Sequence, residues 1–127
     1  MKLLIDSHVY LWLLFAPESL GREALRALDD ADEVLLSTVS LWELTLKSAK
    51  GKLPHDATEL MAGVAALGVR ELPIEHRHLL ALPNVALPHR DPFDAMLVAQ
   101  ASVDQSCLLT ADGYLLGSEY TTLDARS

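Results

Sequence analysis

Residues 89–101, HRDPFDAMLVAQA, place two acids at the start of an apolar helix. Asp91 occupies the N-cap position, and Pro92 follows at the first helical position, where a missing N–H costs nothing. Asp94 falls in the first turn, where the helix dipole favours negative charge. Helical spacing puts its carboxylate on the same face as the apolar Leu97, Val98 and Ala101. The stretch therefore predicts a helix over 92–103 with Asp94 at the rim of the core; alternatively, both acids only stabilise the helix start.

Length and composition predict one compact domain, residues 1–127. The 127 residues are 50% hydrophobic, enough for one core and too few for a second domain. The net charge of −8 argues against a broad nucleic-acid-binding surface, so any such chemistry must rely on a local site or a metal ion. Cys107 is the single cysteine, which excludes an internal disulfide and suits a reducing cytoplasm. Residues 11–15 form an apolar run too short to span a bilayer, so we expect a soluble cytoplasmic protein without a membrane segment.

Short apolar runs alternate with helical patterns along the chain. The runs at 1–5, 33–37, 68–72, 106–109 and 120–123 predict strands. Helices are predicted at 7–14, 22–30, about 41–50, 56–67 and 75–82, besides the one at 92–103. Strands joined through helices pair in parallel, which predicts an α/β sandwich: a central, mostly parallel sheet of about five strands with helices on both faces.

Four acids are expected at the carboxyl edge of this sheet, where ligands bind in such folds. Each follows a predicted strand or opens a neighbouring helix; they are Asp6, Glu43, Asp94 and Asp112. Each also has a local structural explanation. For Glu43, that explanation is a capping box with Ser40 at the start of its helix. Convergence of four acids on one edge nevertheless favours a site.

Crowded carboxylates repel one another unless a cation neutralises them, so the cluster predicts a bound metal. Hard oxygen ligands without paired cysteines select Mg²⁺ or Mn²⁺. Such an ion supports hydrolysis of phosphodiester bonds. His8 and His89 could join the metal, act as acid–base groups, or simply hydrogen-bond at the edge of the cleft. We expect Ser7, Thr38 and Thr110 to hold the acids in place or to cap helices.

Two further surface features leave alternatives open. The basic cluster Lys47, Lys50 and Lys52 is either a solvated helix end or an edge that contacts phosphates. Bulky apolar residues in the first and third helices exceed what one face of each can bury; they are Tyr10, Leu11, Trp12, Leu14, Phe15, Leu41, Trp42 and Leu44. We expect some of them to serve association with a partner, whereas the alternative is that Trp12 and Trp42 fill the core.

The chain resembles the PIN-domain family, specifically the VapC toxins of bacterial toxin–antitoxin pairs. The resemblance covers almost the whole chain through LLIDSHVYLWLL, STVSLWELTLKSAKGKL, PHRDPFDAMLVAQA and LLTADGYL, in this order. It implies a PIN-like three-layer sandwich and an endoribonuclease whose catalytic and metal-binding residues are Asp6, Glu43, Asp94 and Asp112. Asp91 belongs to an H-x-D-P-F-D pattern of one branch, which implies a supporting role, and Ser7 replaces a common Thr while keeping the hydroxyl.

The resemblance also implies an RNA substrate, a homodimer and a cognate VapB-like antitoxin. An antitoxin helix could lie beside Trp12 or Trp42, and its basic side chain could reach the acid cluster and displace the metal.

Three other readings compete with this one. A phosphoacceptor receiver domain would need an acceptor Asp after the third strand, where GVRELPIE has only Glu71 and Glu75. A haloacid-dehalogenase-type phosphatase would need D-x-D after the first strand, where Asp6 is followed by Ser7 and His8. The last alternative is a PIN module that binds but no longer cleaves, against which the intact acid quartet argues.

Overall fold

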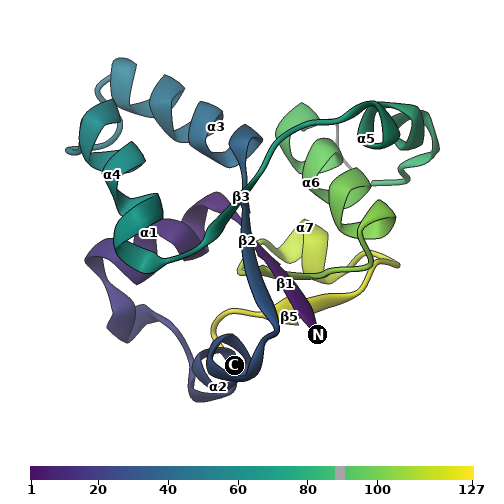
Figure 1. The fold of residues 1–127 in the computed structure, drawn as a ribbon, viewed down its shortest axis with the longest axis horizontal. Helices are drawn as coiled ribbons and strands as arrows, with labels where there is room; N and C mark the ends of the chain where they lie inside the picture. Colours follow the sequence, from purple (N-terminus) through teal and green to yellow (C-terminus); the bar gives the residue numbers. More distant parts are fainter. Residues whose placement is uncertain (88–90) are drawn as a thin grey trace.

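The structure, a computed structural model, describes residues 1–87 and 91–127 and contains a five-stranded sheet (Figure 1). Its strands are β1 (Lys2–Ile5), β2 (Glu33–Ser37), β3 (Arg70–Leu72), β4 (Cys107–Thr110) and β5 (Thr122–Asp124). All neighbouring strands pair in parallel, in the order β3-β2-β1-β4-β5. The predicted parallel sheet is therefore confirmed, and each predicted strand is present within two residues of its expected ends.

Seven α-helices connect and follow the strands within the described residues. They are α1 (Ser7–Phe15), α2 (Arg22–Asp30), α3 (Thr38–Ala49), α4 (Ala57–Leu67), α5 (His76–Ala81), α6 (Pro92–Val103) and α7 (Gly113–Leu116), with short 3₁₀ turns at Pro17–Ser19 and Leu82–Asn84. The sequence did not predict α7. Its N-cap is Asp112, whose carboxylate accepts hydrogen bonds from the backbone N–H groups of Tyr114 and Leu115.

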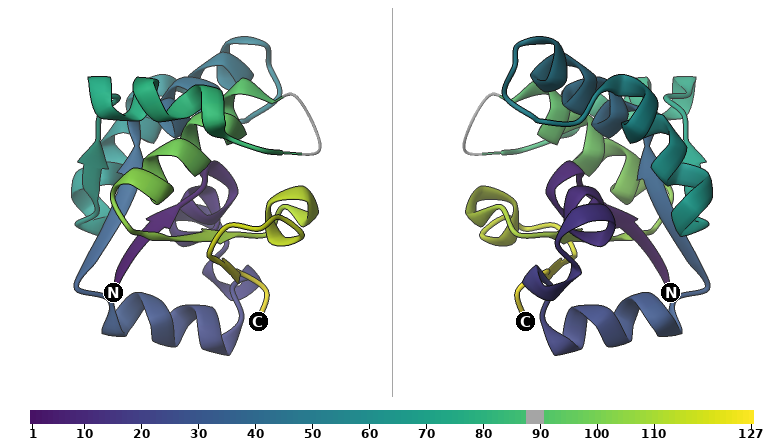
Figure 2. Two further views of the ribbon diagram at one scale, coloured as in Figure 1. Left: turned by 90° about the vertical axis from the view of Figure 1, so that its right-hand side faces the viewer. Right: turned by 90° about the vertical axis from the view of Figure 1, so that its left-hand side faces the viewer.

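Alternate residues of the buried strands pack on opposite faces of the sheet. On one face, Ile5 and its register partners contact the helices α1 to α4. On the other face, Leu4 and its partners contact α6 and α7. Burial on both faces explains why the strands are continuously apolar. Helices thus cover both sides of the sheet, as predicted, and Figure 2 shows α2 running along the molecule between the two chain termini.

The helix α3 begins earlier than predicted, and this changes the reading of Glu43. Ser37, the last residue of β2, is the N-cap, and its Oγ accepts a hydrogen bond from the N–H of Val39 at 3.0 Å. Glu43 therefore lies in the second turn of α3. Ser40 is buried inside the helix, and its hydroxyl has no hydrogen-bond partner within residues 1–87 and 91–127. The explanation of Glu43 by a capping box with Ser40 is therefore wrong, because α3 starts directly at the end of β2.

The bulky apolar residues of α1 and α3 divide between core and surface. Tyr10, Leu41 and Leu44 are buried and belong to the core, so they offer nothing for association. Trp42 is 56% exposed, which excludes the reading that both tryptophans fill the core. Trp12 is half-buried against the core, with the Arg126 guanidinium 5.5 Å from its ring centre.

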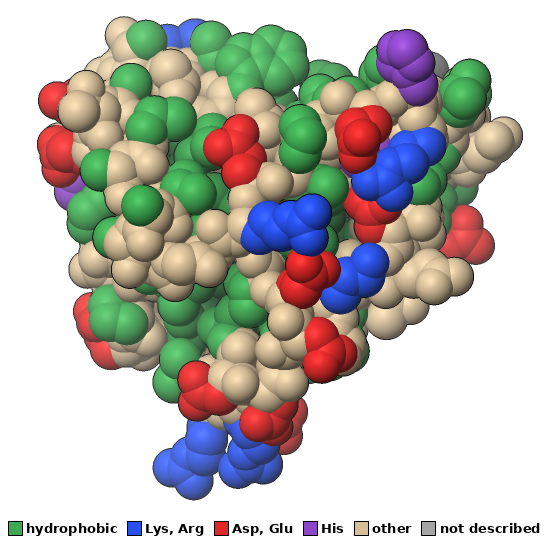
Figure 3. Space-filling model, in the orientation of Figure 1, with side chains coloured by type: hydrophobic (Ala, Val, Ile, Leu, Met, Phe, Trp, Pro, Cys, Tyr) green, Lys and Arg blue, Asp and Glu red, His purple; other side chains and the backbone are tan. Residues whose placement is uncertain are grey.

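Charges of both signs are interspersed on the molecular face drawn in Figure 3, where hydrophobic side chains are exposed as well. Two arginines form ion pairs: Arg70 with Glu33 at 2.6 Å, and Arg77 with Glu75 at 2.7 Å and with Asp104. This face is not a broad basic surface. No helix in the described part of the chain is both long enough and apolar enough to cross a membrane.

Candidate active site

Asp6 is a buried carboxylate at the point where β1 ends and α1 begins. The residue is only 5% exposed. One oxygen, Oδ1, accepts a hydrogen bond from the N–H of Val9 at 2.9 Å, and Oδ2 accepts one from the Thr110 hydroxyl at 2.5 Å. Burial raises the pKa of Asp6 above its usual range, against the opposing effect of these hydrogen bonds and of His8. No lysine or arginine in the described ranges forms an ion pair with this carboxylate.

Thr110, at the end of β4, connects Asp6 to Asp112. Its hydroxyl donates to Asp6 and accepts a hydrogen bond from the N–H of Asp112 at 3.0 Å. The negative charge of Asp112 also raises the pKa of Asp6, so the two acids interact electrostatically. β1 and β4 are neighbours in the sheet, and their parallel pairing brings the two strand ends together.

Glu43 reaches the same region from α3. Its Oε1 accepts a hydrogen bond from the Ser7 hydroxyl at 2.7 Å, and its Oε2 lies 3.8 Å from the Lys47 ammonium. Ser7 directly follows Asp6, so Glu43 is held beside the junction of β1 and α1. The expected supporting roles of Ser7 and Thr110 are confirmed as hydrogen bonds to Glu43 and Asp6.

The start of α6 carries the remaining predicted acids. Asp91 is the N-cap, as predicted, and its Oδ1 accepts hydrogen bonds from the N–H groups of Phe93 at 2.9 Å and Asp94 at 3.3 Å. Asp94 is half-buried in the first turn. The helix α6 packs against α3, and Asp91 lines one pocket of about 490 Å³ together with Glu43.

The described residues contain no group of three or more Asp, Glu, His or Cys side chains arranged to hold a metal ion. Their chemistry nevertheless fits a divalent cation. Asp6 is a buried carboxylate whose pKa is raised further by the like-charged Asp112, and carboxylate oxygens are the ligands that Mg²⁺ and Mn²⁺ prefer. The assignment of Asp6, Glu43, Asp94 and Asp112 as ligands therefore stays a prediction.

Some supporting roles differ from those expected. The Thr38 hydroxyl donates to Glu71 at 2.6 Å, so its predicted role beside the four acids is wrong. His8 is exposed on α1 and influences the pKa of Asp6 through its charge. His89 lies outside the described residues. The helix cap at Asp112 was not predicted, although an Asp followed by Gly and apolar residues is a signal for a helix start.

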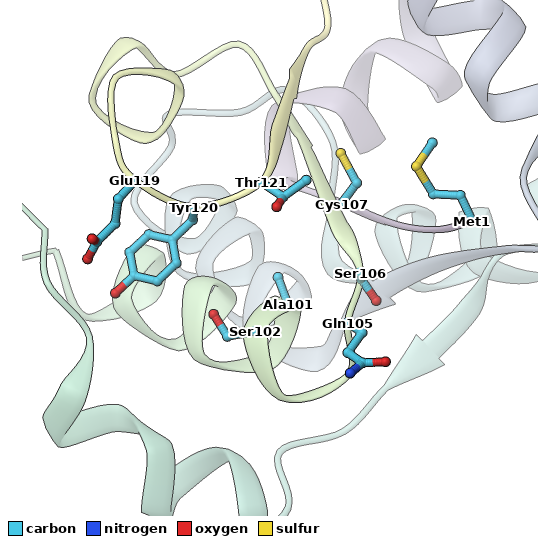
Figure 4. A pocket seen from close by; sticks show the side chains of 9 residues that line it. All are labelled: Met1, Ala101, Ser102, Gln105, Ser106, Cys107, Glu119, Tyr120 and Thr121. Carbon is cyan, nitrogen blue, oxygen red and sulfur yellow. The ribbon is translucent and has the colours of Figure 1, made fainter.

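A second cavity, of about 480 Å³, lies at the amino ends of the strands, away from the carboxyl ends where Asp6 and Asp112 lie (Figure 4). Its lining comes from the starts of β4 and β5, the end of α6 and the chain terminus, including Cys107, Tyr120 and Met1. None of the four predicted acids lines it. Burial raises the pKa of the Cys107 thiol, which disfavours the reactive thiolate. This cavity is therefore separate from the candidate site.

Comparisons with known proteins agree with the observed architecture. The family model of the PIN domain matches residues 3–116. Solved structures with a similar fold include VapBC-1 from nontypeable Haemophilus influenzae (13% identity, 100% of each chain, TM-score 0.69) and FitAcB from Neisseria gonorrhoeae (18%, 97% of each chain, 0.66). DNA-bound VapBC from Salmonella typhimurium is a third (13%, 98% of this chain and 97% of that chain, 0.68). No curated protein matches the chain in sequence. Because the family model spans most of its length, this chain belongs to the PIN domain family.

Proposed function

We propose that this protein is a VapC-type toxin, an endoribonuclease that uses Mg²⁺ or Mn²⁺ to hydrolyse RNA phosphodiester bonds. Its ligands would be Asp6, Glu43, Asp94 and Asp112. The observation that carries the proposal is the pair Asp6 and Asp112, bridged by the Thr110 hydroxyl at the carboxyl edge of a PIN-family sheet. A buried carboxylate with a like-charged neighbour is the arrangement that a divalent cation stabilises.

The protein's own residues would hold and orient the acids. Thr110 keeps one oxygen of Asp6 fixed and positions the backbone of Asp112. Ser7 fixes one oxygen of Glu43. When bound, a divalent cation lowers the pKa of a water molecule and stabilises the charge on phosphoryl oxygens. Hydroxyl groups that orient ligands in this way are typical of metal sites.

A VapB-like antitoxin is the proposed protein partner. Several structures with this fold are described as VapBC or FitAB complexes, and the proposal transfers that partnership to this chain. The acidic site would attract a basic antitoxin side chain, which would displace the metal. Exposed apolar side chains, among them Phe15, Leu79 and Leu80, support association with a protein, either the antitoxin or a second copy of the chain.

The structure argues against one of the alternatives considered above. A receiver-like domain has the strand order 2-1-3-4-5, whereas this sheet has β3-β2-β1-β4-β5. A PIN module without catalysis would share the fold and the antitoxin, so only activity distinguishes it from the proposal.

The test is cleavage of single-stranded RNA by the free protein with Mg²⁺, Mn²⁺ or EDTA. We expect cleavage only with metal and a loss of about a hundredfold or more in Asp6→Asn, as for other losses of charge-stabilising groups. Asp29→Asn is the matched control, because Asp29 is an exposed acid on α2. Cleavage in EDTA, or full activity of Asp6→Asn, would overturn the proposal. Metal binding without cleavage would instead identify the inactive module.

A further inference from the structure

The pocket of about 490 Å³ beside Glu43 lies between the second half of α3 and the start of α6. Besides Glu43 and Asp91, its lining contains Leu46, Pro92, Phe93 and three lysines, Lys47, Lys50 and Lys52. The chain has only ten basic residues against eighteen acids, so three lysines around one pocket form a local exception. Glu43, one of the two lining acids, also belongs to the candidate active site, where it accepts a hydrogen bond from Ser7.

The backbone after α3 brings the lysines together. Lys50 caps α3, and Gly51 has a φ of +73°, a left-handed conformation that favours glycine. The chain therefore reverses, and the N–H of Lys52 donates to the carbonyl oxygen of Lys47 at 2.9 Å. This is the Schellman arrangement that commonly ends a helix, and here it places Lys52 on the same pocket as Lys47 and Lys50.

Two of these lysines form no ion pair with any of the described residues. Lys47 lies 3.8 Å from Glu43. Lys50 and Lys52 are exposed and form no ion pair within the described part of the chain, in contrast to Arg70 and Arg77. Unpaired cations around a concave surface attract an anionic chain such as a phosphate backbone.

One residue of the pocket lining, Phe93, forms an aromatic pair with Trp42 of α3. The exposed Trp42 ring meets the Phe93 ring edge to face, with 5.0 Å between their centres. Phe93 lines the pocket, and Trp42 immediately precedes Glu43 in α3. Proteins that bind single-stranded nucleic acids combine basic grooves with exposed aromatic rings on which bases stack.

We propose that this pocket binds the single-stranded RNA substrate next to the site of cleavage. Lys50 and Lys52 contact its phosphates, and Trp42, supported by Phe93, stacks on a base. The inference rests on the proposed function, because it takes RNA as the substrate. Within that function, this pocket holds the strand, and its lysines contact phosphates instead of only ending a solvated helix.

The first test measures binding of a short, fluorescein-labelled single-stranded RNA of mixed sequence by anisotropy, in EDTA to prevent cleavage. Each phosphate contact in a single strand contributes about −0.7 to the slope of log K against log salt. Replacing Lys50 and Lys52 by Ala should therefore reduce the magnitude of that slope by about 1.4 and weaken binding at low salt. The control is Arg22→Ala with Arg26→Ala, two exposed residues of α2 that change the net charge equally.

A second measurement addresses the aromatic pair. Trp42→Ala should weaken RNA binding about fivefold or more, the lower range for base stacking, with an unchanged salt slope. Trp42→Phe retains an aromatic ring and should keep most of the affinity. If Trp42→Ala leaves RNA binding intact but changes the sedimentation coefficient or antitoxin capture, the ring belongs to a protein interface and the stacking assignment is wrong.

The outcomes separate this inference from the proposed function. If the two lysine substitutions act no differently from the α2 control pair, or if the protein does not bind the RNA, the pocket assignment is overturned even where Asp6-dependent cleavage occurs. If the lysine and tryptophan variants behave as expected but no condition gives cleavage, the pocket assignment stands and the nuclease proposal fails. Circular dichroism of each variant checks that the fold is retained.

Discussion

Burial of Asp6 costs folding free energy whenever its carboxylate is charged. Its pKa is raised in the folded protein, chiefly by burial, so the native state holds the proton more tightly than the unfolded state. The stability of the metal-free protein should therefore fall as the pH rises from the ordinary pKa of 3.8 through the folded value. Above that value the penalty is complete and constant.

The raised pKa of Asp6 leads to a prediction for the stability of the Asp6→Asn variant in EDTA. An asparagine carries no charge, and it can still accept from the N–H of Val9 while its amide donates to Thr110. We expect the variant to be more stable than the wild type at neutral pH, with the difference shrinking as acid protonates Asp6. Urea unfolding over a pH series measures it. A less stable variant at neutral pH would mean that a positive group already compensates Asp6.

Substitutions of Thr110 test whether its hydroxyl, which links Asp6 to the backbone of Asp112, matters for activity. Thr110→Val keeps the shape but removes both the donor to Asp6 and the acceptor for the N–H of Asp112. We expect metal affinity or cleavage to fall about 10- to 100-fold, the usual effect of losing a group that orients metal ligands. Thr110→Ser should keep most activity, because it keeps the hydroxyl. Equal losses in both variants would indicate a packing effect instead.

At the scale of secondary-structure elements, the starts of three helices determine where three of the acids lie. Asp6, Asp91 and Asp112 are the N-caps of α1, α6 and α7. Each cap follows a strand end or opens a helix at the same edge of the sheet, so one local rule puts several carboxylates in one region. A capping role and a role in the site are therefore compatible for the same residue.

Substitutions of the two acids at the start of α6, Asp91 and Asp94, should have different effects on stability and activity. Asp91→Ala removes a confirmed cap and should cost about 1 kcal/mol of stability, with only an indirect effect on activity. Asp94→Ala should leave the melting temperature similar or higher and eliminate turnover. Thermal unfolding and RNA cleavage of both variants provide the comparison. A stable Asp91→Ala variant that lost metal binding would reverse the two roles.

At the scale of the whole molecule, exposed apolar side chains predict a homodimer. Leu80 on α5 is 78% exposed, and Leu79 beside it is exposed as well. We expect the purified chain to sediment as a dimer, and Leu80→Glu to favour the monomer without unfolding, because a buried unpaired charge is costly at an interface. Leu25→Glu on α2, another exposed leucine, is the control. A wild-type monomer at high concentration would contradict the prediction.

The sequence alone determined the parallel sheet and the helix cap at Asp91, and it predicted a site built from four acids. Hydrophobic periodicity and cap residues act over a few neighbours in the chain, so they are readable without a structure. The start of α3 was misplaced because Ser37, Thr38 and Ser40 are all acceptable caps, and local rules do not choose among them.

Only the tertiary structure decided which groups meet. The Thr110 bridge joins residues 104 positions apart, and the hydrogen bond from Ser7 to Glu43 spans 36. The same holds for the pocket that Lys52 shares with Phe93 and for the exposure of Trp42 against the burial of Tyr10. Such contacts depend on strand order and on helix packing across the sheet, because those set the distances between residues remote in sequence.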